Sequence, residues 1–132
     1  MTPPFALGPG EGETIEGPAG GPLTFKARGE QTGGALTAVE NVIAPGDGPP
    51  LHTHANEDEA WYVLEGRARL ELGAPGERML NNEVVGPGAA FHFPPGTVHR
   101  VTAVEDTTII EVSTPQLDDI VRLEDQYGRS GQ

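Results

Sequence analysis

The 132-residue chain contains no cysteine, so it forms neither a disulfide bond nor a thiolate metal site. Only seven residues are aromatic, which predicts a largely aliphatic core. Basic residues are also few, with 8 Lys and Arg against 20 Asp and Glu, and the net charge of −12 argues against a nucleic-acid partner. No apolar run is long enough to span a bilayer, and no basic-then-apolar leader is present. We therefore expect a cytoplasmic protein with neither a membrane nor a nucleic-acid partner.

Glycine and proline are abundant, at 19 and 13 residues, and short runs of alternating apolar and polar residues lie between them. This pattern predicts one turn-rich, all-β domain. The expected strands are residues 23–28, 35–43, 59–64, 67–72, 79–85, 90–93, 98–104 and 107–112. Residues 1–22 read as an N-terminal arm, 23–114 as the β domain and 115–132 as a helical tail.

Two histidines at positions i and i+2, His52 and His54, lie directly before the strand that begins at Glu59. Alternate side chains of a strand share one face, so this spacing directs both imidazoles to a common point. Imidazole and carboxylate together suit divalent Fe, Mn, Ni, Co, Cu or Zn. Taken alone, the pair is equally compatible with two ordinary surface histidines near an acidic turn.

A second block, Gly88 to His99, decides between these readings. The first block fills G(x)5HxH(x)3–4E(x)6G with Gly46, His52, His54, Glu59 and Gly66, and the second fills G(x)5PxG(x)2H with Gly88, Pro94, Gly96 and His99. Nine positions at fixed spacing, in two blocks that are separated by 21 residues, make the chain resemble the cupins, a superfamily of small β-barrels. One position departs, because residue 103 is Ala where the second motif ends in Asn.

The resemblance implies a jelly-roll β-barrel that holds one divalent transition metal per chain. It implies that the ligands are His52, His54, Glu59 and His99. A slip of register would bring in Glu57 or Asp58, but Asp58 is the wrong acid for the motif, so Glu59 is the expected ligand. Only one acidic residue is expected beside the histidines, which leaves a glycosidase without its second carboxylate.

Strand alternation predicts the lining of a substrate pocket. If Glu59 faces the metal, Trp61 and Val63 lie on the same face, and Val101 and Ala103 share a face with His99. This lining is apolar. His92, between two phenylalanines, is expected at the rim or in solvent rather than in proton transfer, and Arg100 is expected to point away from the substrate.

After residue 114 the apolar residues no longer alternate as in a strand but recur at helical spacing. Thr114-Pro115 resembles a helix start, and Leu117, Ile120 and Val121 recur at helical spacing, so we expect a short C-terminal helix. Residues 118–129 resemble the tail of cupins that act as mannose-6-phosphate isomerases or are fused to mannose-1-phosphate guanylyltransferases. Residues 48–66, by contrast, resemble the quercetin-dioxygenase-like small cupins.

Three functions follow from these resemblances. The first is a metal-dependent, dioxygenase-like oxidoreductase acting on a small enol or aromatic substrate, with Glu59 as ligand and possible base. The second is a sugar or sugar-phosphate isomerase, which the apolar lining disfavours because nothing there pairs with a phosphate. The third is a metal-dependent small-molecule binding module that is not an enzyme.

We also expect a homodimer. The strand at residues 23–28 is flanked by Gly/Pro segments, and an uncovered strand edge can pair with the sheet of a second subunit.

Overall fold

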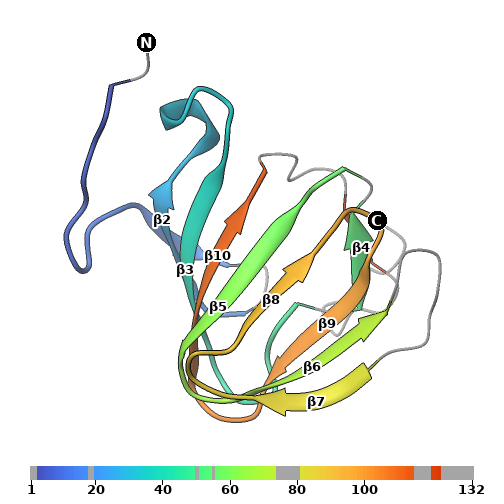
Figure 1. Cartoon of the computed structure of the whole chain (residues 1–132). Coiled ribbons are helices and arrows are strands. Elements are labelled where there is room, and N and C mark those ends of the chain that lie inside the picture. Colours follow the sequence, from blue (N-terminus) through green and yellow to red (C-terminus); the bar gives the residue numbers. More distant parts are fainter. Residues whose placement is uncertain are drawn as a thin grey trace.

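A computed structural model describes residues 3–17, 20–49, 51–54, 56–73, 81–114 and 120–122. The regular secondary structure of this part is almost entirely β (Figure 1), and its one helix is a single 3-10 turn, Gly29–Gln31. The strands are β1 (Thr14–Glu16), β2 (Pro22–Ala27), β3 (Thr37–Ile43), β4 (His52–His54), β5 (Glu59–Glu65), β6 (Ala68–Gly73), β7 (Asn81–Val85), β8 (Ala90–Phe93), β9 (Val98–Ala103), β10 (Thr107–Ser113) and β11 (Ile120–Arg122). The described residues contain no helix that is long and apolar enough to cross a membrane.

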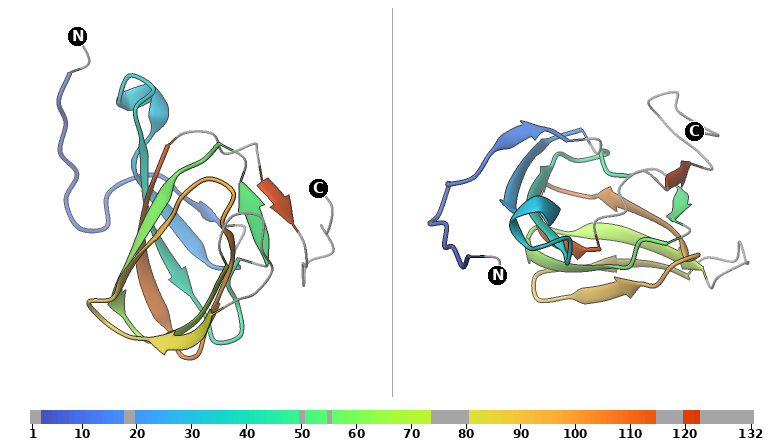
Figure 2. Two further views of the ribbon diagram at one scale, coloured as in Figure 1. Left: turned by 45° about the vertical axis from the view of Figure 1, so that its right-hand side comes forward. Right: turned by 90° about the horizontal axis from the view of Figure 1, so that it is seen from above.

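These strands form two antiparallel sheets that face each other (Figure 2). One has six strands in the order β1-β2-β3-β10-β5-β8, and the other has five in the order β11-β4-β9-β6-β7. The arrangement is consistent with a jelly roll. It corrects one part of the prediction, because the two sheets form a sandwich and do not close into a single hydrogen-bonded barrel.

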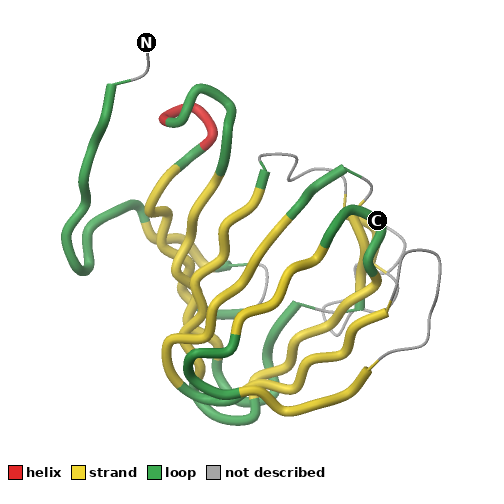
Figure 3. Tube along the Cα trace, in the orientation of Figure 1, coloured by secondary structure: helices red, strands yellow, loops and turns green. Residues whose placement is uncertain are grey.

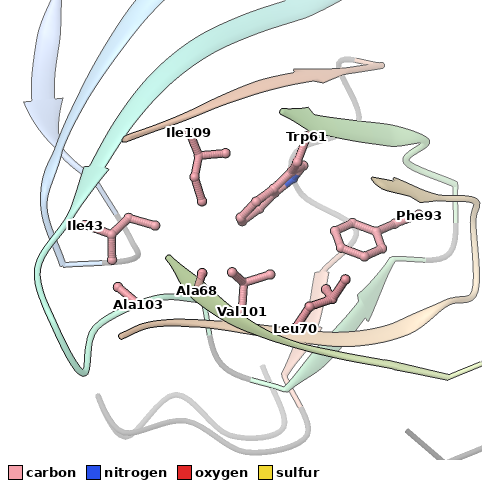
Figure 4. Close-up of a cluster of buried hydrophobic side chains, with 8 residues drawn as sticks. All are labelled: Ile43, Trp61, Ala68, Leu70, Phe93, Val101, Ala103 and Ile109. Carbon is pink, nitrogen blue, oxygen red and sulfur yellow. The ribbon is translucent and has the colours of Figure 1, made fainter. Parts of the chain in front are cut away.

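The core lies between the sheets, where side chains from both inner faces meet (Figure 4). Its members are mostly aliphatic, as the composition predicts: Ile43, Trp61, Ala68, Leu70, Phe93, Val101, Ala103 and Ile109. They come from alternate positions of their strands, so β3 and β5 each bury every second residue. Period-two alternation therefore specifies which face of each strand is inside.

Two glycines permit close backbone approaches that no other residue would allow. Gly66, between β5 and β6, has φ +85°, and a Cβ there would lie 2.2 Å from the carbonyl oxygen of Asp106. Gly48, in the loop before β4, has φ +142°, and its Cβ would lie 2.0 Å from the carbonyl oxygen of Val101. The same loop is hydrogen-bonded to β9, because Gly46 N–H donates to the Ala103 carbonyl and Ala103 N–H to that of Asp47.

The prediction of a C-terminal helix was wrong for residues 120–122, the part of the tail that the structure describes. Ile120–Arg122 is a strand that pairs antiparallel with β4, with Ile120 opposite His54 and Arg122 opposite His52. The physical reason is that β4 would otherwise present an unpaired edge, and Ile and Val fit a strand at least as well as a helix. The remaining residues of the predicted helix, 115–119 and 123–127, lie outside the described part.

At the other end, residues 3–13 form an arm (Figures 1 and 3), which is bonded to β2 where Lys26 Nζ donates to the Gly8 and Glu11 carbonyls and Phe25 N–H donates to that of Glu13. The following short strand β1 was not predicted, and it pairs with β2 at the edge of the six-stranded sheet. The predicted strand at 23–28 is confirmed as β2, which pairs with β3 on its other side.

Candidate metal centre

The His-x-His pair lies on a strand, as its spacing predicts. β4 spans His52–His54 and lies between β11 and β9, with His52 directly opposite His99. The two blocks of the motif, which are far apart in sequence, are thus joined in one sheet. The side chains of His52 and His54 are outside the described part, so the structure specifies only their backbone and its pairing.

The other two predicted ligands meet across the sandwich. Glu59 begins β5 in the six-stranded sheet, and His99 lies on β9 in the five-stranded sheet. His99 Nε2 and Glu59 Oε1 are 2.9 Å apart, and the side chains are only 1 % and 9 % exposed. Among the side chains that the structure describes, no third His, Cys, Asp or Glu joins these two in a metal-binding group.

Two contacts fix the imidazole of His99. Its Nδ1 lies 3.2 Å from the carbonyl oxygen of Thr97, to which an Nδ1–H donates. Its ring stacks on Phe93, with centroids 4.0 Å apart and planes 11° apart. A histidine that donates through Nδ1 presents a lone pair on Nε2, which is the tautomer a metal ligand requires.

The separation of the two ligand atoms fits a shared ion. Two neighbouring ligands of an octahedral centre with bonds of about 2.1 Å stand about 3.0 Å apart. The observed 2.9 Å between Nε2 and Oε1 is close to that edge length. His99 and Glu59 could therefore hold two adjacent positions of one ion, whereas the part of His52 and His54 in such a site stays a prediction.

Two further carboxylates lie near this point; the sequence analysis named Glu57 only as a ligand by a slip of register and did not name Glu111. Glu57 is only 3 % exposed. Glu111 shares the inner face of β10 with the buried Thr107 and Ile109. Burial, and then the charges of Glu59 and Glu57, raise the pKa of Glu111 well above its usual value. Alternation along β10 was the available signal, because it puts residue 111 in register with Ile109.

The neighbouring acid, Asp58, faces the opposite side. His92 Nε2 and Asp58 Oδ1 are 2.5 Å apart, and the side chains are 60 % and 48 % exposed. They line a surface depression of about 260 Å³ with Ala60 and Val112. His92 thus lies at the outer surface, where the sequence analysis expects it, and Asp58 is turned away from His99.

The four residues predicted to line the pocket, Trp61, Val63, Val101 and Ala103, are all buried. Trp61, Val101 and Ala103 belong to the packed core cluster (Figure 4). Their contact with a substrate stays a prediction. Arg100 faces away from the interior and donates from Nε and Nη2 to the two carboxylate oxygens of Glu71, at 2.9 Å each.

A two-sheet sandwich with an interior His/Glu centre is the architecture expected of a small metal-binding jelly roll. The chain belongs to the cupins, since the model of the Cupin domain family matches residues 39–113.

Three comparisons place the chain among known proteins. It is 32 % identical over 91 residues to mannose-1-phosphate guanylyltransferase 2 of Escherichia coli O157:H7. The matched region covers 65 % of this chain but only 18 % of that protein. It is similar to KdgF from Halomonas sp., with 28 % identity, a TM-score of 0.70, and 89 % of this chain and 98 % of the other covered. Oxalate decarboxylase from Bacillus subtilis shares the fold, with 22 % identity and a TM-score of 0.73 over 96 % of this chain and 33 % of the other. That decarboxylase has Mn(II) centres.

Proposed function

We propose that the protein is a mononuclear metal-dependent enzyme of dioxygenase type, acting on a small organic compound that binds as an enol or an ionised hydroxyl. The observation that carries the proposal is the buried pair of ligand atoms, His99 Nε2 and Glu59 Oε1, 2.9 Å apart beside β4. An imidazole nitrogen and a carboxylate oxygen that lie this close together supply a ligand pair that suits a divalent transition metal.

The four ligands would be His52, His54, Glu59 and His99. A bound divalent ion would supply Lewis acidity toward an enol and, for Fe, Mn, Ni, Co or Cu, the redox chemistry that an oxidation requires. One carboxylate against a divalent charge leaves the centre at about +1, which favours an anionic ligand atom. Four protein ligands leave about two octahedral positions for substrate or oxygen.

The chain's own residues would position the reaction. Thr97 and Phe93 hold His99 in one tautomer and one orientation. Glu59 lies where it can accept the proton of an incoming hydroxyl. Trp61 and the neighbouring aliphatic residues exclude water from the inner end of the site, which suits a flat or apolar enol.

Oxygen uptake tests the proposal. Protein loaded separately with Fe, Mn, Ni, Co, Cu or Zn is given a flavonol and an enolisable diketone in an oxygen-electrode cell. We expect uptake with at least one redox-active metal and almost none with Zn. Glu59→Gln should cut turnover by about 100-fold or more, as expected when a ligand charge or a base is lost. The matched control Glu40→Gln, on the outer face of β3, should retain wild-type turnover.

A second candidate is a sugar or sugar-phosphate isomerase, favoured by the similarity to the mannose-1-phosphate guanylyltransferase. In that case the metal would hold two adjacent sugar oxygens. Interconversion of mannose and fructose phosphates by metal-loaded protein that takes up no oxygen with any enol would establish this activity and reject oxidation. Saturable binding without turnover of either kind would instead identify a binding module.

A further inference from the structure

The inner face of the six-stranded sheet carries polar atoms that the packed core does not satisfy. Trp61 is 3 % exposed and Asn41 is 2 % exposed. Neither Trp61 Nε1 nor Asn41 Oδ1 has a hydrogen-bond partner among the described residues. Buried polar atoms in native proteins are nearly always paired, with protein, water or ligand. These two atoms therefore point to a bound group that supplies the missing partners.

Glu111 belongs to the same inner face. On β10 it is directly opposite Trp61 of β5 and, on the other side, Val39 of β3. Directly opposite residues in an antiparallel pair have their Cβ atoms about 4.5–5.5 Å apart. Within the described part of the chain Glu111 makes no hydrogen bond or ion pair. A carboxyl acceptor and an indole N–H donor thus lie side by side, and neither has a hydrogen-bond partner among the residues that the structure describes.

The register between β5 and β10 gives the position of Glu111 and Trp61 relative to the predicted metal centre. Glu59 is opposite Ser113, whereas Trp61 is opposite Glu111, two residues further along each strand. Two residues of a strand advance about 7 Å. Glu111 and Trp61 therefore lie one row deeper in the sandwich than the predicted ligand Glu59. A small molecule that reaches the metal with one end can reach this row with the other.

The charges around this row favour a neutral group over an anion. The five cations whose side chains are described have partners elsewhere: Lys26 with the Gly8 and Glu11 carbonyls, Arg28 with Glu13, Arg67 with Glu105, Arg69 with Asn82 and Arg100 with Glu71. Glu57, Glu59 and Glu111 make the described surroundings acidic. A phosphate or carboxylate would be repelled, but a hydroxyl group can donate to one partner and accept from the other.

We propose that Glu111 and Trp61 form a hydroxyl-binding subsite, in which a carboxyl oxygen of Glu111 accepts a hydrogen bond from a ligand hydroxyl and the Trp61 indole N–H donates to that hydroxyl. The inference rests on the proposed metal centre, since the ligand's other end is held there. It narrows the substrate class to compounds that carry a second hydroxyl group beyond the atoms that reach the metal.

Two metal-chelating hydroxypyranones serve as probes, because kojic acid differs from allomaltol only by one hydroxyl on its methyl group. Both bind metals through the same hydroxy-ketone. Dissociation constants for each would be measured by calorimetry on Zn-loaded wild type, Glu111→Leu, Glu111→Gln and Trp61→Phe. Glu40→Leu is the matched control, since Glu40 is also half-buried but faces outward on β3.

Wild type and Glu40→Leu should bind kojic acid about tenfold more tightly than allomaltol, the preference expected for one well-paired buried hydrogen bond. Glu111→Leu should lose most of this preference, because the acceptor of the ligand hydroxyl is removed, while its affinity for allomaltol is kept. Trp61→Phe should keep part of the preference because the Glu111 acceptor remains, and Glu111→Gln should keep part because its amide oxygen still accepts.

Metal content, measured on every sample, separates the two proposals. Wild-type protein that takes up no metal rejects the metal centre. Metal-loaded wild type that binds both pyranones equally, or a Glu111→Leu variant that retains the wild-type preference, overturns the subsite and leaves the metal centre standing.

Discussion

At the scale of single residues, His99 shows how an apolar core can hold a reactive imidazole. Its Nδ1 faces the Thr97 carbonyl, its ring lies flat on Phe93, and its Nε2 faces Glu59. Each contact restricts a different freedom: the tautomer, the tilt of the ring and the direction of the lone pair. His92, only seven residues earlier, contacts Asp58 at the surface instead, and its side chain is mostly exposed.

This contrast predicts which histidine binds metal. Protein purified without added metal should carry close to one divalent transition-metal ion per chain, measured by elemental analysis. His99→Ala should lose most of it, because a buried ligand atom is removed and Glu59 is left without its partner. The control His92→Ala should retain wild-type content. Equal loss in both variants, or full occupancy in His99→Ala, would remove His99 from the ligand set.

At the scale of strands, β6 and β9 are joined on their outer face by a paired contact. Glu71 and Arg100 are directly opposite, and both carboxylate oxygens accept from the guanidinium. The hydrogen bond from Arg100 lowers the pKa of Glu71 below its ordinary value of 4.5, although burial opposes it. Because β9 carries His99, this pair stabilises the strand that supports the site.

Arg100→Met should therefore reduce the free energy of unfolding by about 1 kcal/mol at pH 7, as for a partly buried bidentate pair. A lowered folded-state pKa stabilises the protein fully above the unfolded value of 4.5, and this stabilisation is lost as the pH falls through the folded value. The difference from wild type should thus shrink between pH 7 and pH 3 in urea titrations. Arg69→Met, which removes a bond to the neutral Asn82 and only the smallest of the charge effects on Glu71, should show a smaller pH-dependent difference and serves as the comparison. A difference that is independent of pH would contradict the assignment.

Some strands could be predicted from the sequence and others could not. β5 and β9 could be placed because each buries every second residue, which also put Glu59 and His99 inside. β11 could not, because Ile120 and Val121 fit both periods, and pairing with the free edge of β4 decided between them. Three-residue β1 is too short to show any alternation.

Glu111 illustrates a different limit. Its alternation with Ile109 is visible in the sequence, but a charged residue at an inward position is normally taken as a sign that the strand faces water. Only the pairing of β10 between β3 and β5 shows that both neighbours bury the same face. The role of Glu111 therefore depends on tertiary contacts that no local pattern contains.

At the scale of the whole molecule, the arm and the edge strand bear on assembly. Phe5, Leu7 and Ile15 are 40 % exposed or more, and β1 leaves one edge of the six-stranded sheet unpaired within the described part of the chain. β2, which the sequence analysis expected to offer the free edge, is paired on both sides. Within the described residues, β1 rather than β2 is thus the edge strand at this end of the six-stranded sheet.

We expect a homodimer, with a mass by light scattering of about twice the 13.9 kDa of the chain. Replacing Phe5 and Leu7 with Asp should shift the protein toward monomer, because burial of these side chains would stabilise the pairing. Val84→Asp, at an exposed position on the other sheet, should leave the mass unchanged. A 13.9 kDa species at micromolar concentration would contradict the expected dimer.

The contact of Gly48 with β9 has a consequence for how such a site can change over evolutionary time. The loop that leads to His52 is held against the strand of His99 by main-chain contacts, namely the Gly46, Asp47 and Ala103 hydrogen bonds and the close approach of Gly48 to Val101. Ligand side chains can therefore be exchanged, and metal preference altered, while their spacing is inherited unchanged. A single added methyl group at position 48 would separate the two halves.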